Sequence, residues 1–277
     1  MIKLVHLCKY KYSKVKLQNE KSAFERARKE ISEIFYMDIE YNRSKGGYYI
    51  SNMEDVERFE LRKWLIETFQ VDNILHKNPR FRKRILLENV PSGQKHLMPI
   101  KDAINNNETI LLTYQSYFRD KELYLEVEPY FVKLFKQRWY LVGKIAGSSK
   151  YRTFSLDRIE ELTKTKHKFE IPQNVETDKI FIDYYGVMTN DDDFDKAETV
   201  VLKVDAKQAF HLLSLPLHHS QKEERKDEYS IFSYYLCPTF DFRQTVLSLG
   251  DEAEVLEPAD LRNHMADIVK NMLERYK

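Results

Sequence analysis

Asp191, Asp193 and Asp195 stand at alternate positions, and among the residues of this sequence their type and spacing most resemble those of a metal site. A calcium-binding loop begins in this way, but it requires Gly at its sixth position and a bidentate Glu at its twelfth. Lys196 and Leu202 stand at those two positions. We therefore expect a solvated loop here and no bound metal.

The glycines exclude three large classes of enzyme by their spacing. Only seven are present, and none has the spacing of a Walker loop or of the dinucleotide-binding fingerprint. Gly143 and Gly147 enclose Lys-Ile-Ala, so the G-x-S-x-G elbow lacks its central Ser. His211, His218 and His219 lack a carboxylate–histidine spacing typical of metal sites. We therefore expect no enzymatic activity and no cofactor.

The cations near the N-terminus suggest a different chemistry, which is contact with phosphate groups. Ser22-Ala-Phe-Glu25 has the form of a capping box, and apolar residues at helical spacing follow it. The segments Asp38–Asn42 and Tyr48–Ile50 alternate and flank a loop with two cations and two glycines, which predicts a β-hairpin. A recognition helix followed by a wing has this order. The candidate contacts with duplex DNA are Arg26, Arg28, Lys29, Arg43 and Lys45.

Residues 1–52 are accordingly expected to form part of a winged helix-turn-helix. Only 21 residues precede Ser22, and they show no helical periodicity, so we expect an incomplete DNA-binding domain. A plain helix–hairpin packing unit is the alternative. Residues 53–97 are expected to be a helical linker, with one amphipathic helix from Glu54 to about Lys77. The basic cluster Arg80–Arg84 follows it and either contacts phosphate or is simply solvated.

Residues 98–172 are expected to form a small barrel of the SH3- or Sm-like type, because short strands with tight turns follow one another. In the fourth strand the alternation places Trp139 and Leu141 on one face and Arg138 and Tyr140 on the other. The expected strands are Thr109–Gln115, Tyr124–Val127, Tyr130–Phe135, Arg138–Gly143 and Tyr151–Leu156.

The last third of the chain is predicted to be a linker, residues 173–197, followed by a folded domain, residues 198–277. The linker contains Phe181-Ile-Asp-Tyr-Tyr-Gly186, which we expect to pack on a neighbouring domain. Beyond it, alternating and helical patterns succeed one another in the order βαββαβ with one added helix, which favours a ferredoxin-like sandwich. The whole chain is therefore expected to be a multidomain α+β protein.

Two motifs in the barrel region resemble the WYL-domain family. Arg138-Trp-Tyr-Leu-Val-Gly143 contains the tripeptide that names the family, and Tyr151-Arg-Thr-Phe-Ser-Leu-Asp-Arg-Ile159 is similar to the run that follows it at the same separation. Ser22–Asn52 resembles the second half of the helix-turn-helix upstream of such domains, and residues 198–277 resemble their C-terminal extension. The sequence departs from the family at Leu125, where many members carry Arg.

The resemblance implies a bacterial transcriptional regulator whose barrel senses a ligand, with nucleic acid, and single-stranded DNA in particular, as the leading class. Tyrosine faces stack on bases of any identity, and arginines supply phosphate contacts. On the positions that match the family, the implied groove residues are Tyr140, Arg152 and Arg158, then Arg138, Ser155 and Tyr114, with Lys133 and Lys136 as rim cations.

Each of these residues also has a purely structural interpretation. Trp139 is expected in the core, Tyr140 could be buried with a satisfied hydroxyl, and Arg158 could pair with Asp157 or Glu160. The function has an alternative too, namely a sensor of a nucleotide or another small anionic metabolite that acts through dimerisation or a partner protein.

The distribution of charge agrees with a polyanionic partner for the front of the chain. Residues 1–52 carry 11 basic and 6 acidic side chains, whereas residues 173–277 carry 12 and 21. No apolar run is long enough to span a bilayer, and two cysteines cannot form a disulfide framework. We therefore expect a cytoplasmic protein without a membrane partner, which forms a homodimer.

Overall fold

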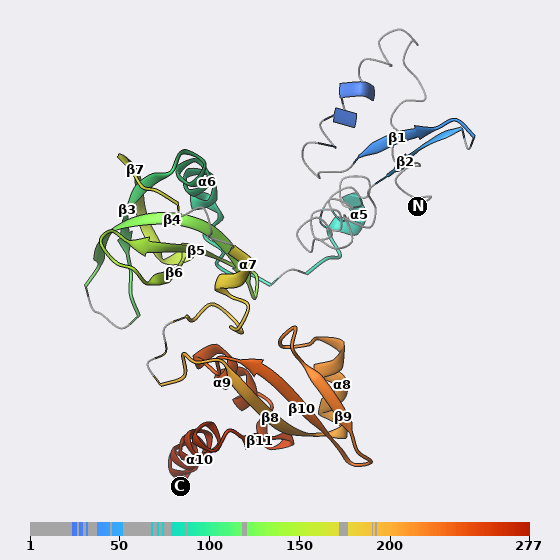
Figure 1. Cartoon of the computed structure of the whole chain (residues 1–277), viewed down its shortest axis with the longest axis vertical. Helices are drawn as coiled ribbons and strands as arrows, with labels where there is room; N and C mark the ends of the chain where they lie inside the picture. Colours follow the sequence, from blue (N-terminus) through green and yellow to red (C-terminus); the bar gives the residue numbers. More distant parts are fainter. Residues whose placement is uncertain are drawn as a thin grey trace. The chain divides into compact units, whose positions relative to one another are not determined.

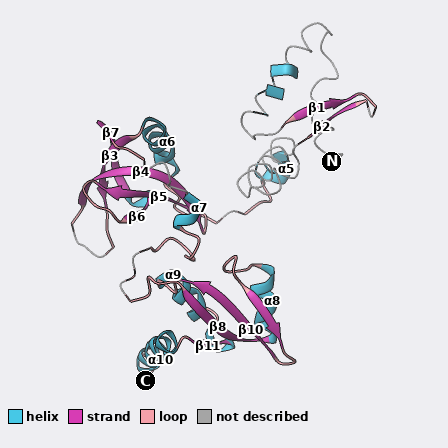
Figure 2. Ribbon diagram, in the orientation of Figure 1, coloured by secondary structure: helices cyan, strands magenta, loops and turns pink. Residues whose placement is uncertain are grey.

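The computed structural model divides the chain into two compact units, Met1–Glu88 and Asn89–Lys277, which are described separately (Figure 1). The structure describes residues 24–26, 28–29, 32, 38–44, 46–51, 68, 71, 74, 79–86, 88–117, 121–171, 177–189, 191 and 193–277. Figure 2 shows the helices and strands of these residues.

The first unit contains the predicted hairpin. Strands β1 (Ile39–Asn42) and β2 (Gly47–Ile50) pair antiparallel, and the described residues between 24 and 32 are helical. The ring of Phe24 lies 4.7 Å from that of Tyr48, so the helix packs on the hairpin. The helix α5 (Pro79–Arg82) includes the start of the basic cluster. Ser22 of the capping box and most of the predicted helix 54–77 lie outside the described residues.

A five-stranded antiparallel sheet forms the barrel at the start of the second unit, in the order β6-β5-β4-β3-β7. The outer strands β6 and β7 follow one another in the chain and are joined only by the short helix η2 (Leu156–Arg158), so the sheet must curl to bring its two edges together. The elements are η1 (Gln94–His96), α6 (Leu97–Asn106), β3 (Glu108–Tyr114), β4 (Leu123–Phe135), β5 (Arg138–Ile145), β6 (Tyr151–Ser155) and β7 (Ile159–Lys168).

The core of the barrel lies between α6 and one face of the sheet. Ile100 of α6 is fully buried with Ile110, Leu141 and Leu156, and Trp139 packs against the same cluster. The predicted alternation in β5 is therefore confirmed, with Trp139 and Leu141 directed toward the core. That alternation leaves Arg138 and Tyr140 on the outer face of the strand.

The structure differs from the sequence prediction in three elements of the barrel, β4, β7 and α6. The segments Tyr124–Val127 and Tyr130–Phe135 were expected as separate strands, but they form the single strand β4 with a bulge between Pro129 and Phe131. Pro129 is tolerated because it lies beyond Val127, the last residue of β4 that pairs with β3. Strand β7 and helix α6 were not anticipated.

The ferredoxin-like prediction for the C-terminal domain is confirmed in element order and topology. The sheet order β11-β8-β10-β9, with every pair antiparallel, follows from the βαββαβ order along the chain. Val200, Leu202, Phe232 and Phe242 are buried in its core. The elements are β8 (Glu198–Asp205), α8 (Ala206–Ser214), β9 (Lys222–Arg225), β10 (Tyr229–Leu236), α9 (Phe240–Leu247), η3 (Gly250–Glu252), β11 (Ala253–Glu257) and the added helix α10 (Ala259–Glu274).

Candidate ligand-binding face of the barrel

Three of the predicted groove residues form one row across the outer face of the barrel sheet. Lys133 of β4 pairs with Tyr140 of β5, and Tyr140 pairs with Ser155 of β6. Side chains of directly paired residues project from the same face of a sheet. The structure thus brings Lys133, Tyr140 and Ser155 together on the face opposite to Trp139 and Leu141.

Arg138 lies on the same face, and its charge is already neutralised by Asp157. The Nε of Arg138 is 3.3 Å from Oδ1 of Asp157, and its Nη2 donates to Oδ2. Ser155 Oγ also donates to Oδ1 of Asp157, at 2.5 Å. Burial favours a higher pKa for Asp157, but the hydrogen bonds from Arg138 and Ser155 outweigh it and the pKa is lowered. Arg138 therefore orders the turn η2 and is only partly available to a ligand.

Arg158 is held in a different way, between two tyrosine rings. Its guanidinium carbon lies 4.9 Å from the ring centre of Tyr114 and 4.4 Å from that of Tyr117. Its Nε is buried and has no hydrogen-bond partner in the described part of the chain. The alternative interpretation, a pairing of Arg158 with Asp157, does not describe this arrangement, because Asp157 bonds Arg138 and Arg158 lies against the tyrosine rings instead. Arg158 is thus a preorganised cation with an unused donor.

Tyr117 is a member of this site that the sequence reasoning missed. Its side chain is 70% exposed, whereas Tyr114 is only 5% exposed and accepts a hydrogen bond from the backbone N–H of Ser155 at 3.1 Å. An exposed aromatic three residues after a buried one was the available signal. Tyr117 is therefore the solvent-exposed ring of the pair that contacts Arg158, and Tyr114 is the buried one.

The hydroxyl of Tyr140 stays protonated under physiological conditions. Burial raises the pKa of Tyr140, while the charge of Arg138 and a hydrogen bond with Ser155 act in the opposite direction. Tyr140 is therefore a half-buried ring with a polar end, which suits contact with a base or a phosphate oxygen.

Burial lowers the pKa of Lys133 to about 8. Its Nζ lies 3.7 Å from the ring centre of Phe181, a residue of the segment that follows the barrel. Lys133 was predicted as an open rim cation, but its side chain is partly buried and covered by an aromatic ring.

Two other predicted groove residues lie apart from this row. Arg152 pairs with Gly143, which is three residues from Tyr140 along β5, so Arg152 projects on the opposite side of the sheet and is exposed. Lys136 occupies the turn between β4 and β5, where its Nζ lies 5.3 Å from the ring centre of Phe135. The outer face is therefore less basic than the prediction implied.

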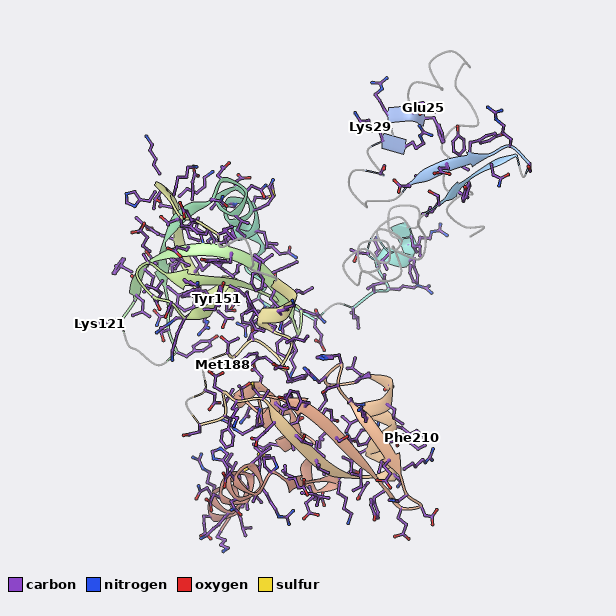
Figure 3. All side chains as sticks on the ribbon, viewed as in Figure 1. Glu25, Lys29, Lys121, Tyr151, Met188 and Phe210 are labelled. Carbon is purple, nitrogen blue, oxygen red and sulfur yellow. The ribbon has the colours of Figure 1, made fainter. Side chains whose placement is uncertain are left out.

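A second group of a cation and aromatic rings lies toward the other end of β5. The Nζ of Lys144 lies 4.5 Å from the ring centre of Tyr151 and 5.2 Å from that of Tyr130. Figure 3 labels Tyr151 on the barrel. The sequence reasoning did not single out these residues.

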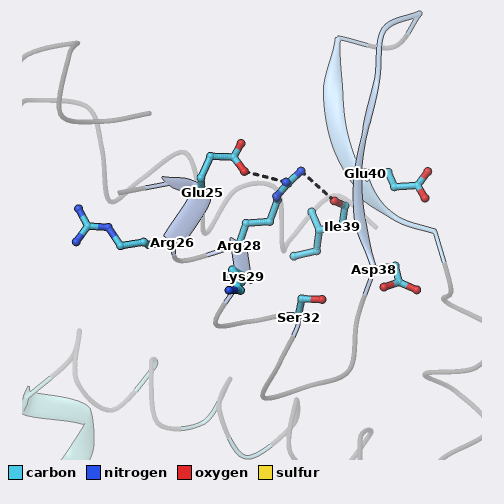
Figure 4. A pocket seen from close by; sticks show the side chains of 8 residues that line it. All are labelled: Glu25, Arg26, Arg28, Lys29, Ser32, Asp38, Ile39 and Glu40. Atoms are coloured by element: carbon cyan, nitrogen blue, oxygen red, sulfur yellow. Dashed lines mark hydrogen bonds and ion pairs between the residues drawn. The ribbon is translucent and has the colours of Figure 1, made fainter. Parts of the chain in front are cut away.

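The structure describes four of the five predicted duplex contacts in the first unit. Arg28 forms an ion pair with Glu25 at 2.8 Å and reaches the backbone oxygen of Ile39 at 3.5 Å (Figure 4). Arg26 and Lys29 line the same hollow. Arg43 is exposed in the hairpin turn, and Lys45 lies outside the described residues. Arg28 therefore joins the helix to the hairpin.

The acidic loop near the C-terminal domain has a structural role. Asp191 forms an ion pair with Arg243 at 3.0 Å, with about a tenth of each side chain exposed, and it accepts a hydrogen bond from the backbone N–H of Phe240. Asp195 accepts a hydrogen bond from the hydroxyl of Tyr184 at 2.7 Å. The expectation of a merely solvated loop is wrong for Asp191, because its carboxylate compensates the buried charge of Arg243.

No group of three or more metal-ligating side chains occurs among the described residues. Within the same residues, no helix combines the length and the apolar character needed to cross a bilayer. His218 is buried, and its ring bonds Ser220 Oγ at 2.7 Å and the backbone oxygen of Ile182 at 2.8 Å. It therefore has a structural role.

Two family models match the chain. One describes a WYL domain and matches residues 95–164, and the other describes a WCX domain and matches residues 196–273. The first match extends from η1 into β7, and the second covers β8 to nearly the end of α10. A search of curated proteins gave no match.

The chain is also similar to two solved structures. The proteasome accessory factor B/C (PafBC) of Arthrobacter aurescens is 17% identical, and the match covers 69% of this chain and 28% of that chain with a TM-score of 0.30. A CRISPR Cas-related protein is 13% identical, and the match covers 66% of this chain and 52% of that chain with a TM-score of 0.44. The chain spans about a quarter of the length of the first protein and half of the second.

Proposed function

This chain belongs to the WYL-domain family of regulators, with a WCX domain behind the barrel, and from that premise we propose that its barrel face binds nucleic acid and thereby controls transcription. The ligand we propose is single-stranded DNA. The function is regulatory and not enzymatic, and it needs no metal or cofactor.

The observation that carries this proposal is the guanidinium of Arg158, which lies against two tyrosine rings and whose Nε has no hydrogen-bond partner among the described residues. A buried donor without a partner costs free energy, and the guanidinium that carries it can form charge-assisted bonds with a phosphate. Tyr117 lies against Arg158 and is mostly exposed, so a base can stack on its free surface. Tyr140 and Ser155 supply hydroxyl groups on the neighbouring strands.

Binding at the barrel would act on transcription by changing the populations of two arrangements of the protein. A ligand shifts such an equilibrium only through its different affinity for the two states. We propose that the helix and hairpin of the first unit contact duplex DNA through Arg26, Lys29 and Arg43. We also propose that the protein acts as a homodimer in the cytoplasm of a bacterium.

A second candidate is a sensor of a nucleotide or another small anionic metabolite. It is supported by the neutralisation of Arg138 by Asp157 and by the position of Arg152 on the opposite face, which leave few cations for a long polyanion. A site with one stacked guanidinium and one covered lysine would fit a single phosphate group.

The decisive experiment is a fluorescence-anisotropy titration with a labelled single strand of about ten nucleotides and a matched duplex over a salt series. Phosphate contacts release counterions, so the logarithm of affinity should fall linearly with the logarithm of salt concentration. Arg158→Ala is expected to weaken single-strand binding about tenfold and to reduce the salt slope by about one. Tyr140→Ala should weaken binding with little change in slope.

Arg225→Ala, an exposed position on β9, is the matched control because it removes the same charge from another domain. The proposal fails if neither nucleic acid binds at low salt, or if Arg158→Ala and Arg225→Ala weaken binding equally. Saturation by a mononucleotide with little salt dependence would establish the metabolite sensor in its place.

A further inference from the structure

The segment that connects the barrel to the C-terminal domain contacts both. It begins with α7 (Thr177–Ile180), and Phe181 and Tyr185 are its principal aromatic residues. The ring of Phe181 lies 6.1 Å from that of Phe131 on β4, edge to face, and the ring of Tyr185 lies 5.6 Å from that of Phe135 on the same strand. Tyr185 also lies 6.2 Å from Phe242 of the C-terminal core.

Polar contacts fix this segment to the C-terminal domain. A carboxylate oxygen of Asp241, on α9, accepts hydrogen bonds from the backbone N–H groups of Val187 at 2.7 Å and Met188 at 2.9 Å. The backbone N–H of Cys237 donates to the oxygen of Asp183 at 2.7 Å. Figure 3 labels Met188 at the end of the segment. Residues 181–188, which we name the connecting strap, are thus anchored to the C-terminal domain by hydrogen bonds.

The strap places an aromatic ring on a cation of the ligand-binding face. The Nζ of Lys133 lies 3.7 Å from the ring centre of Phe181, and no ion pair or hydrogen bond holds that ammonium among the described residues. Burial lowers the pKa of Lys133 to about 8, and the carboxylate of Asp241 only partly offsets this effect. Lys133 is a partly desolvated charge with an aromatic ring as its neighbour.

We propose that Lys133 is a phosphate-binding residue and that Phe181 covers it, so that a phosphate group of single-stranded DNA and the Phe181 ring exclude one another. This inference rests on the function proposed above. A charge-assisted bond from an ammonium to a phosphate is stronger than its contact with the face of a phenyl ring. Because Lys133 pairs in register with Tyr140, a strand bound at Tyr140 would bring a phosphate near it.

Displacement of Phe181 would shift the strap, and the strap is hydrogen-bonded to Asp241 on α9 and to Cys237. The shift would therefore also act on the C-terminal domain. Ligand binding at the barrel would therefore loosen one contact between the barrel and the strap while the strap keeps its bonds to the other domain. This gives the barrel face a direct mechanical connection to the domain behind it.

The first test measures the affinity for a labelled single strand of about ten nucleotides in the full chain. If the covered state predominates by about ten to one, Phe181→Ala is expected to tighten binding about tenfold, because it removes the competing state. Ile182→Ala is the matched control, since Ile182 is on the same strap but is 47% exposed. In the background of Lys133→Met the gain from Phe181→Ala should disappear.

The second test needs no nucleic acid and separates this inference from the proposed function. Amine-reactive labelling with mass spectrometry should modify Lys133 slowly in the wild type and faster in Phe181→Ala, with no change in Ile182→Ala. Equal labelling of Lys133 in all three proteins would refute the cover, whether or not DNA binds.

A third measurement uses only the wild type, so it does not depend on how the variants fold. Hydrogen exchange of the backbone amides of residues 181–184 should accelerate when the single strand is added. If DNA binds and these amides exchange at the same rate or more slowly, the competition is refuted while the proposed function stands. If no DNA binds, the proposed function fails, and the labelling result alone decides whether Phe181 covers Lys133.

Discussion

Single residues on the barrel face differ mainly in how their charge is compensated. Arg138 has a carboxylate partner in Asp157, Arg158 is stacked between two tyrosines, and Lys133 lies under Phe181. A paired guanidinium must give up a bond to meet a ligand, whereas a stacked one with an unused donor gains a bond. We therefore expect Arg158 to contribute more to ligand affinity than Arg138.

The buried charge of Lys133 should be visible in the pH dependence of stability. The pKa of Lys133 is lowered from 10.5 to about 8 on folding, so between these values the unfolded chain holds a proton that the folded chain has released. The free energy of unfolding must then rise with pH across this window, and the cost of the buried charge is fully present below it. Lys133→Met is expected to stabilise the protein by about 1–3 kcal/mol near neutral pH.

Urea denaturation of the wild type and Lys133→Met at about pH 7 and about pH 10 checks this expectation. The advantage of the variant should shrink at the higher pH, because Lys133 is then neutral in the folded chain and the pH has come close to the unfolded pKa of 10.5. Lys136→Met removes an exposed cation of the same kind and should show no such trend. A difference in stability that is constant with pH would contradict a buried charge at Lys133.

At the scale of elements, the short helix η2 controls the geometry of the site. It joins the two outer strands of the barrel and carries both Asp157 and Arg158. Gly93, before η1, packs directly on η2, and a Cβ at this position would lie 2.3 Å from the backbone carbon of Leu156. The positions of Asp157 and Arg158 therefore depend on a glycine far from them in the sequence.

Gly93→Ala is expected to lower the free energy of unfolding by about 3 kcal/mol, since it adds a steric clash to the cost of a positive φ. Gly147→Ala is the matched control, because Gly147 also has a positive φ but its Cβ would meet open space. The control should lose only about 1 kcal/mol. Equal losses in thermal or urea unfolding would show that the contact with η2 is unimportant.

At the scale of the whole molecule, the two compact units are expected to have separate roles. Asn89–Lys277 contains the two hydrophobic cores found among the described residues and all of the barrel face, whereas Met1–Glu88 contains the hairpin and the cations proposed to contact duplex DNA. Helix α10 shows a further property of the larger unit. Leu261 and Met265 are buried in the core of the C-terminal domain, whereas Met272 and Leu273, farther along the helix, are exposed.

Residues 89–277 alone are expected to unfold cooperatively and to bind single-stranded DNA as tightly as the full chain, because the barrel face is complete within them. Binding to duplex DNA should be weaker than in the full chain, because the cations of the first unit are lost. Circular dichroism and the anisotropy titration check both parts. Loss of single-strand binding in a folded fragment would assign that function to the first unit.

The sequence by itself determined the features that depend on local periodicity. The alternation in β5 separates Trp139 from Tyr140 because successive side chains of a strand point to opposite faces. The βαββαβ order restricts the C-terminal domain to few topologies, and the observed sheet order is one of them. The two motifs of the barrel were sufficient to indicate its family.

Only the tertiary structure decided how the side chains of the site are paired. The contact of Tyr114 with Arg158, the pairing of Arg138 with Asp157 and the cover of Lys133 by Phe181 join residues that are distant in sequence. Such contacts depend on strand register, on the curl of the sheet and on the path of the strap, none of which a local pattern specifies. The position of Arg152 on the face opposite to Tyr140 also depends on strand register, because Arg152 pairs with Gly143 and therefore projects from the same face as Gly143.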